Sequence, residues 1–297
     1  MHTSRFGSLG VQSAGASLKL RLLFLALLLS YGLLLAPFAG HMATRPTVVR
    51  LGYTPHPQLL KLTTADHGLL VAEAAVVKIL FYYGTVIEKS LKNVIIRPEY
   101  LNMYRTVVTA TQLDPYNQDA YYFAQAAFTW ELGRVVEVNE LLEESARWRA
   151  WDPWPPFYVG FNNAYFLKDY VKASQYMQLA AERSNNPLFA KLAARYFYES
   201  EQTDLGLTFL EAMIAQAKDK AVKHTYQVRR DALLAIAEIE EAIAAFRLRH
   251  GQSPAELKDL IANGFLGKVP VDPYGGTFYL DSQGRVRSTS KLANPNL

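Results

Sequence analysis

A turn made of an acidic or amide residue followed by proline recurs along the middle of this chain. The turns are Asp114-Pro115, Asp152-Pro153 and Asn186-Pro187. Around them the sequence repeats a similar pattern about every 34 residues. Between the turns, apolar residues have the spacing expected for two short helices. A pair of short helices cannot bury its apolar face alone, so neighbouring pairs must stack. The sequence therefore predicts an array of stacked helix pairs.

Residues 84–215 resemble the tetratricopeptide repeat family. Its members carry small residues near positions 8, 20 and 27 of each unit, large residues near positions 4, 17 and 24, and a closing proline near position 32. Four units fit when they start at Gly84, Asp119, Trp154 and Pro187. Residues in the expected positions include Tyr100, Ala110, Tyr122, Ala126, Gly133, Phe157, Ala173, Ala180, Ala194 and Gly206. The resemblance implies a superhelix of helix pairs that holds a partner and seldom performs chemistry.

Several positions depart from the family pattern. Phe161 and Ala164 reverse the usual order of a small and a large residue in the third unit. Met103 and Val138 stand where small residues are expected. These departures leave a non-repetitive helical bundle open as the alternative fold.

An uncharged, leucine-rich segment at residues 22–40 predicts a transmembrane signal anchor. Nineteen helical residues at 1.5 Å each nearly span a hydrocarbon core of about 30 Å. Lys19 and Arg21 precede the segment, which favours a cytoplasmic tail at residues 1–21. A cleaved signal peptide is the alternative, but cleavage after Ala36 or Ala39 would not leave a small residue at the −3 position.

An extended linker is expected at residues 41–65, because Pro46, Pro55 and Pro57 disfavour helix in the residues before them. The helical repeats are then expected over residues 66–223. Their first apolar run, Leu69 to Ile87, has the length of a second membrane span, but its charged residues favour a buried first helix.

The character of the chain changes at residues 224–297. A long helix to Arg249, a short helix at residues 255–263, and two β segments at residues 277–280 and 285–288 are expected, the last two forming a hairpin. This order, with the motif Pro-Val-Asp-Pro-Tyr-Gly at residues 270–275, resembles the globular head of type II secretion major pseudopilins. A pseudopilin carries its assembly helix directly before the head, whereas repeats intervene here, so polymerisation into a pilus is not implied.

Pseudopilin heads often bind calcium in the carboxy-terminal loop. Here Asp272 and Asp281 are the nearby carboxylates, whereas calcium takes six to eight oxygen ligands. The alternative for Asp272 is a turn residue that accepts hydrogen bonds from local amides. We expect no other metal and no cofactor.

Two sets of residues are candidates for partner binding. The repeat resemblance assigns the concave wall to the first helix of each unit, where aromatic anchors and two basic residues suit an extended or helical peptide. These groove candidates are Phe123, Trp130, Tyr158, Asn162, Tyr165, Lys191, Arg195 and Tyr198. A second candidate, a docking patch, is formed by Trp148, Trp151 and Trp154. The alternative for each aromatic residue is packing between repeats.

Other functional classes find little support. Cysteine is absent, which excludes disulfides, thiolate metal sites and cysteine nucleophiles. The net charge of +4 is mild and the basic residues alternate with acids, so nucleic-acid binding is not expected. The six histidines lack metal-ligand spacing, and we find no phosphate-binding glycine loop or nucleophile elbow. We therefore expect no enzymatic activity.

The expected fold is mainly α: a tetratricopeptide-like helical repeat superhelix with an N-terminal transmembrane helix and a small C-terminal α+β hairpin module. We expect a non-enzymatic scaffold in a bacterial inner membrane, with its soluble part on the periplasmic side. Its partner would be a protein or peptide of the cell envelope, in pilus assembly or type II secretion. The alternative function is a structural subunit of an envelope complex or filament that makes contact through the C-terminal module.

Overall fold

The computed structural model describes residues 11–44, 49–92 and 96–290 of the chain. The fold is mainly α, at 73% helix, and consists of an N-terminal apolar helix, consecutive packed helix pairs and a small two-stranded antiparallel hairpin. These parts confirm the expected fold class at this level. The chain divides into two compact units, residues 1–50 and residues 51–297.

In the described residues of the first unit the chain forms one helix, α1 (Val11–Thr44), which is 34 residues long. Its apolar stretch Leu20–Met42 is 23 residues long, and none of it is buried among the described residues. The run of leucine and alanine favours helix, and Pro37 lies within it. A helix with this length and composition could be a signal anchor or a signal sequence.

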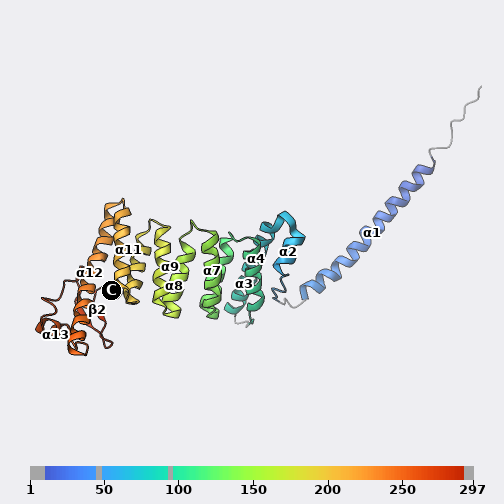
Figure 1. Ribbon diagram of the computed structural model, residues 1–297. Coiled ribbons are helices and arrows are strands. Elements are labelled where there is room, and N and C mark those ends of the chain that lie inside the picture. The colour runs from blue at the N-terminus through green and yellow to red at the C-terminus, as the bar shows by residue number, and fades with distance from the viewer. Residues whose placement is uncertain (1–10, 45–48, 93–95, 291–297) are drawn as a thin grey trace, which may run out of the picture. The chain divides into compact units, whose positions relative to one another are not determined.

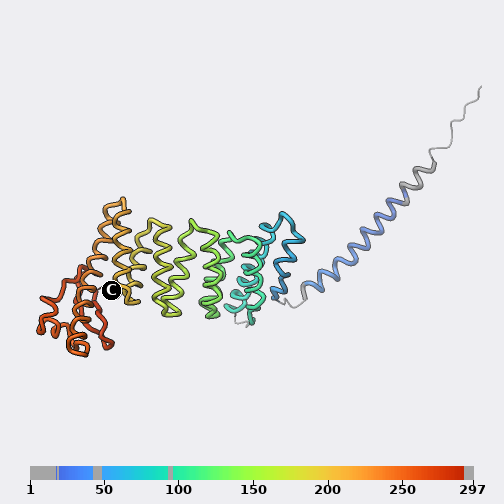
Figure 2. The backbone as a smooth tube through the Cα atoms, in the orientation of Figure 1, coloured from blue at the N-terminus to red at the C-terminus, as the bar shows by residue number. Residues whose placement is uncertain are grey.

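The second unit is built from helices that pack on the helices next to them in sequence (Figures 1 and 2). The helices are α2 (Pro57–Thr64), α3 (Gly68–Leu91), α4 (Tyr100–Leu113), α5 (Gln118–Phe123), α6 (Trp130–Leu132), α7 (Val135–Trp148), α8 (Trp154–Asn162), α9 (Tyr170–Glu182), α10 (Pro187–Glu199), α11 (Thr203–Gln216), α12 (Lys220–His250) and α13 (Leu257–Ala262). Short turns of wider or tighter helix join some of them: η1 (Ala65–His67), η2 (Ala124–Thr129) and η3 (Asn163–Leu167).

Three helix pairs follow the expected register. Their first helices are α5 continued through η2 and α6, α8 continued through η3, and α10, and they begin at or within one residue of the expected starts at 119, 154 and 187. Their second helices are α7, α9 and α11. Helix α10 packs on both α9 and α11, and α8 packs on both α7 and α9, so each pair also contacts the next pair.

The first expected unit differs from the pattern. Gly84, its expected start, lies inside α3, which continues for 24 residues. No proline interrupts the chain there, the Thr85 hydroxyl donates to the Phe81 carbonyl within the helix, and Ile79, Tyr82 and Val86 keep one buried face on either side of Gly84. Helix α3 packs on α4, and this longer pair takes the place of the first repeat.

The turn between the two helices of each pair has the same backbone form in all three units. The fifteenth residue of each unit has a left-handed conformation, with φ of 63° at Gly133, 57° at Lys168 and 60° at Glu201. The next residue donates a backbone hydrogen bond to a carbonyl five or six residues earlier: Arg134 to Phe128, Asp169 to Asn163, and Gln202 to Phe197. This recurring geometry supports the internal repeat independently of side-chain identity.

The Asx-Pro turns between units also share one hydrogen bond. At each turn the side-chain oxygen accepts from the backbone N–H two residues later, as expected for these residues. The pairs are Asp114 with Tyr116, Asp152 with Trp154, and Asn186 with Leu188, each at 3.0 Å. Proline then begins the following helix or precedes it. The periodic turns of the sequence thus mark the boundaries of the packed units.

The expected linker is shorter than residues 41–65. Helix α1 reaches Thr44, and residues 57–64 form α2 where extended chain was expected. Pro57 occupies the first helical turn, where its missing N–H has no helical partner to lose, and His56 accepts a hydrogen bond from the Gln58 N–H. Among the described residues of the linker, extended chain is confined to 49–56.

The C-terminal module follows the expected order. Helix α12 begins after the side-chain cap of Asp219 and ends at Gly251, which has a φ of 73°. The strands β1 (Phe278–Leu280) and β2 (Val286–Ser288) pair antiparallel, with Tyr279 opposite Arg287. One continuous hydrophobic core joins the last two helix pairs to α12, α13 and the hairpin. The module is therefore part of the array's core.

The sequence places Gly206 at a small position where paired helices cross closely. An added Cβ there would lie 3.0 Å from the Phe197 Cβ and 3.1 Å from the Leu233 Cδ1. We expect Gly206→Leu to lower the free energy of unfolding by about 2 kcal/mol or more, because the buried neighbours leave no space. Chemical denaturation measures this loss.

The matched control is Gly84→Leu, at a helical glycine with nothing within 4 Å of an added Cβ. It should gain up to about 1 kcal/mol from helix propensity. Equal effects of the two substitutions would contradict the close crossing at Gly206.

Candidate functional site

A continuous set of aromatic rings covers the first helices of the second and third units. We call this set the aromatic face. It comprises Tyr122, Trp130, Phe157, Tyr158, Phe161, Tyr165 and Phe166. An open pocket of about 450 Å³ lies in it, lined by five of these rings together with Gln125 and Ala126. Trp130 and Tyr165 are 54% and 53% exposed, so their rings are available to another molecule.

Helical spacing gathers these rings on one side. Phe157, Phe161 and Tyr165 are four residues apart, so they follow one face of α8 and η3. Tyr165 stacks on Phe161 with ring centroids 5.4 Å apart and an interplanar angle of 8°. Trp130, from the neighbouring unit, reaches the same rings and lies 5.6 Å from Tyr165. The face therefore spans two stacked units.

A buried amide network lies beneath the pocket. Asn162 and Gln125 exchange two hydrogen bonds, of 2.8 and 2.9 Å, and Asn162 also donates to the Asn139 Oδ1 at 2.8 Å. Asn162 has 0% exposure. This groove candidate therefore lies in the interior, where it joins both helices of the second unit to α8.

Other groove candidates also lie away from the aromatic face. Phe123 is 7% exposed and packs edge-on against Tyr83 and Phe128. Tyr198 is 4% exposed, and its hydroxyl donates to the Val286 carbonyl of β2. The structure thus brings Trp130, Tyr158 and Tyr165 together and places Phe123 and Tyr198 in the core.

The basic candidates lie on α10 beside the C-terminal module. Arg195 Nε lies 4.0 Å from the Glu199 carboxylate. The Lys191 carbonyl accepts a hydrogen bond of 3.3 Å from Arg229, and the Arg229 guanidinium lies 5.4 Å from the centre of the Tyr274 ring. Burial lowers the pKa of Arg229. Lys191 and Arg195 are therefore separate from the exposed aromatic rings.

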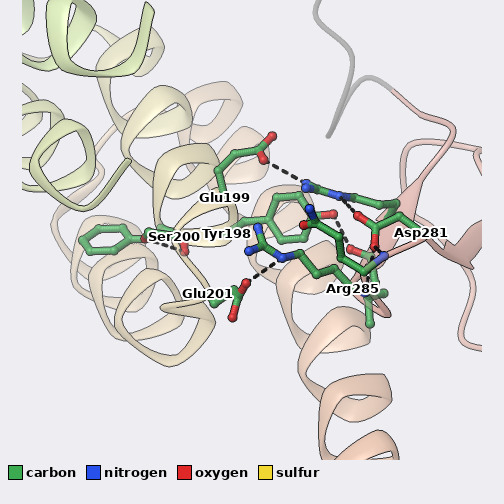
Figure 3. Close-up of polar contacts among 10 residues, drawn as sticks. Tyr198, Glu199, Ser200, Glu201, Asp281 and Arg285 are labelled. Carbon is green, nitrogen blue, oxygen red and sulfur yellow. Dashed lines mark hydrogen bonds and ion pairs between the residues drawn. The ribbon is translucent and has the colours of Figure 1, made fainter. Parts of the chain in front are cut away.

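The hairpin is held to the end of α10 by ion pairs (Figure 3). Arg285 Nε lies 2.7 Å from a Glu201 carboxylate oxygen, and Arg287 contacts both Glu199 at 2.8 Å and Asp281 at 3.1 Å. A polar cleft of about 610 Å³ lies among these groups and the face of α12 that carries Glu240 and Arg247. Two of its arginines, Arg285 and Arg287, pair with two of its carboxylates, Glu201 and Glu199. These pairs join the C-terminal module to the helical array.

Burial and hydrogen bonding shift several pKa values around this cleft. Burial raises the pKa of the Tyr198 hydroxyl to about 12. Burial acts to lower the pKa of Arg287, but hydrogen bonds to Glu199 and Asp281 reverse the effect and raise it. Burial also raises the pKa of Glu240, with the carboxylates of Asp204 and Glu201 adding to the effect. The cleft thus disfavours the ionised form of Glu240 and favours the ionised form of Arg287.

The docking-patch tryptophans separate into two groups. Trp148 and Trp151 gather around Tyr116, with centroid distances of 5.8 and 5.9 Å. Trp154 lies against Phe157 and Phe189 instead. Arg149 makes two hydrogen bonds to Asp152, at 2.8 and 3.1 Å, and fixes the turn between the two groups.

The two calcium candidates have protein partners. Asp272 is 2% exposed and accepts from the Tyr274 N–H and the Ser288 hydroxyl. Asp281 accepts from Arg287 and from the Gln283 and Arg285 N–H groups. Within residues 11–44, 49–92 and 96–290, no three His, Asp or Glu side chains are grouped as metal ligands are. Asp272 therefore has the turn geometry that the sequence offered as its alternative.

The sequence did not reveal the hairpin contacts, because Arg287 is 88 residues from Glu199, the last residue of α10, and Arg285 is similarly far from Glu201, just after that helix. Alternation of Arg285 and Arg287 in the β-prone run shows that both side chains share one side of the strand. Nothing in the sequence identifies which helix that side meets.

The chain was compared with protein-family models, curated proteins and solved structures, and none of them matches it. The structural features above therefore carry the functional argument.

Removal of the Asn162 side chain should destabilise the fold. Asn162→Ala leaves the Gln125 and Asn139 amides buried without this partner, which costs about 1–3 kcal/mol. Gln175→Ala, at an exposed position of α9, is the control and should change stability by less than about 0.5 kcal/mol. Urea denaturation of the two variants makes the comparison. A stable Asn162→Ala variant would show that the network is dispensable.

Glu240→Gln should stabilise the protein in a pH-dependent way. A carboxyl group with a raised folded pKa favours folding below its ordinary value of 4.5, and this contribution is lost as pH rises through the folded pKa. The neutral amide avoids that loss, so the melting temperature should rise relative to wild type at pH 8 and be similar at pH 4. Glu241→Gln, the exposed neighbour, is the control. An equal effect of Glu240→Gln at both pH values would contradict the proposed cause.

Proposed function

We propose that this protein is a non-enzymatic, membrane-anchored scaffold that binds a peptide segment of a protein partner on its aromatic face. The observation that carries the proposal is the exposed ring surface of Trp130 and Tyr165 beside an open pocket. Large aromatic side chains supply contact area at low cost in conformational entropy, and they dominate binding energy at protein interfaces.

The chemistry of the face favours an apolar or proline-containing segment. Six of the seven pocket-lining residues are aromatic or aliphatic, and the amide of the seventh, Gln125, bonds with Asn162. Grooves lined by aromatic rings bind extended proline-rich segments, because the proline rings pack against the faces of the aromatic rings. The only cation placed over these rings by the described contacts is Lys168, 5.5 Å from the Tyr165 ring centre.

The finer identity of the fold belongs to the same proposal. The left-handed fifteenth residue and the Asx-Pro turns support a tetratricopeptide-like superhelix. The apolar, uncovered α1 supports a signal anchor that holds the array on the outer side of a bacterial inner membrane. The pseudopilin-like order of the C-terminal elements supports a role in envelope assembly, linked to pilus or type II secretion machinery.

The partner-binding role can be tested by crosslinking in the native membrane. A photoreactive amino acid at Tyr165 of the full chain should capture a partner that mass spectrometry identifies. The same group at Trp151, which lies on the separate Tyr116 cluster, is the position control. Equal capture from both positions, or capture of copies of this chain alone, would contradict a peptide-binding aromatic face.

Substitution of the exposed rings should then release the captured partner. In co-purification without a crosslinker, Trp130→Ala with Tyr165→Ala should lower recovery of that partner at least about tenfold, because both rings would contribute anchor contacts. Trp148→Ala with Trp151→Ala should leave recovery unchanged. Circular dichroism melting of both variants checks folding, and full recovery with the Trp130 and Tyr165 variant would rule out the face.

A further inference from the structure

A second apolar surface lies at the N-terminal end of the array. We call it the outer face of α2–α3. Its side chains are large and widely exposed: Leu62 by 81%, Leu69 by 63%, Leu70 by 70%, Val77 by 42%, Phe81 by 75% and Leu91 by 80%. These residues lie on α2 and α3, ahead of the aromatic face.

Helix geometry shows that this surface is separate from the packed side of α3. Ala72, Ile79 and Val86 are buried on the side that meets α4. At 100° per residue, Leu70, Val77 and Phe81 project from the opposite side, within a stripe about 40° wide. Between Leu70 and Phe81, helix α3 is therefore apolar on two opposite sides, and only one of them is covered by the described protein, whereas the exposed stripe ends at the charged Glu88.

The two ends of the array are treated differently. Terminal units of stacked repeats need a polar outer surface to be soluble. At the C-terminal end, α12 and the hairpin share the core of the last pairs and complete them. At the N-terminal end the outer face of α2–α3 is leucine-rich instead. A soluble protein rarely leaves such a surface open, so it marks an interaction site.

The length of the tether favours a lipid surface as the occupant. Residues 45–56 separate the end of α1 at Thr44 from the start of α2 at Pro57. Twelve residues span at most about 42 Å. If α1 crosses a bilayer, every copy of the chain keeps the start of α2, where the outer face of α2–α3 begins, within about this distance of that bilayer's surface.

The charges around the face suit an anionic membrane surface. Lys61 on α2 and Lys78 on α3 are exposed. Glu88 pairs with Lys92 at 2.5 Å and Glu73 accepts from the Asn117 amide at 2.9 Å, whereas Asp66, between α2 and α3, is a further exposed acid. Basic side chains beside an apolar helix face are typical of helices that lie in the headgroup region.

We propose that the outer face of α2–α3 binds the surface of the lipid bilayer that holds α1, with Leu62, Leu70 and Phe81 inserted below the headgroups. This contact rests on the anchoring role proposed for α1. Lipid would then cover the exposed apolar side chains at this end of the array and hold the first helix pair at the membrane surface. The aromatic face would follow it along the array.

The absence of cysteine gives a direct test with the full chain. Single variants Leu62→Cys, Leu70→Cys and Phe81→Cys carry an environment-sensitive fluorophore in vesicles of phosphatidylcholine and phosphatidylglycerol. Leu28→Cys on α1 is the control for the anchor, and Lys172→Cys, exposed on α9, is the control for water. Quenching is measured with a nitroxide attached to lipid and with aqueous iodide, after circular dichroism confirms the fold.

We expect the labels at Leu62, Leu70 and Phe81 to be quenched by the shallow lipid nitroxide, and to lose more than about half of the iodide quenching seen at Lys172. Iodide quenching equal to that at Lys172, with Leu28 in lipid, would overturn the contact alone. Protection that needs high protein density and shows no lipid quenching would overturn it in favour of a second copy. A Leu28 label outside lipid would overturn the anchor, and with it this contact, but would leave the peptide-binding test of Tyr165 unaffected.

Discussion

Nearest-neighbour packing is the constraint on which the second unit depends. Each short helix pair buries its apolar face against the pairs beside it, so the relative placement of pairs has to be reproduced at every step. Two backbone devices do this: an Asx-Pro turn between pairs and a left-handed residue within each pair. Because both are local, their geometry repeats even where Phe161 and Ala164 exchange the usual large and small positions. Such an array is stabilised by contacts between neighbouring pairs, and its hydrophobic core extends from pair to pair into the C-terminal module.

In an array of this kind, the first and last pairs each lack a neighbour on one side, so their outer apolar surfaces need another cover. At the C-terminal end, α12 extends the stacking and the hairpin locks onto α10 through Tyr198, Arg285 and Arg287. This module covers the side of α10 that would otherwise continue the candidate groove, which is why Tyr198 is buried while Tyr165 is exposed. The open part of the groove is thereby confined to the second and third units.

The sequence predicts the parts of this structure that local chemistry determines. The three later helix pairs, the long helix α12 and the hairpin follow from proline turns, apolar period and glycine positions close to each element. The first pair was misplaced because Gly84, of a residue type that often ends a helix, lies inside α3, where the buried face continues to Val86. The left-handed Lys168 and Glu201 carry no glycine signal. The burial of Asn162 and Tyr198 depends on partners 23 to 88 residues away, and residue type alone does not show which aromatic or amide side chain meets them.

Sequence order and spatial order coincide within residues 51–290, because helices pack on partners close to them in the chain. Adjacent helices lie about 8–10 Å apart, so the aromatic face is separated from α3 by only a few helix layers. The leucine-rich outer face, the aromatic face and the ion-paired hairpin therefore occupy successive parts of one array. Their chemistry changes in the same order, from apolar through aromatic to charged. A partner segment bound at Trp130 and Tyr165 would thus lie between an end suited to lipid and an end closed by the chain itself.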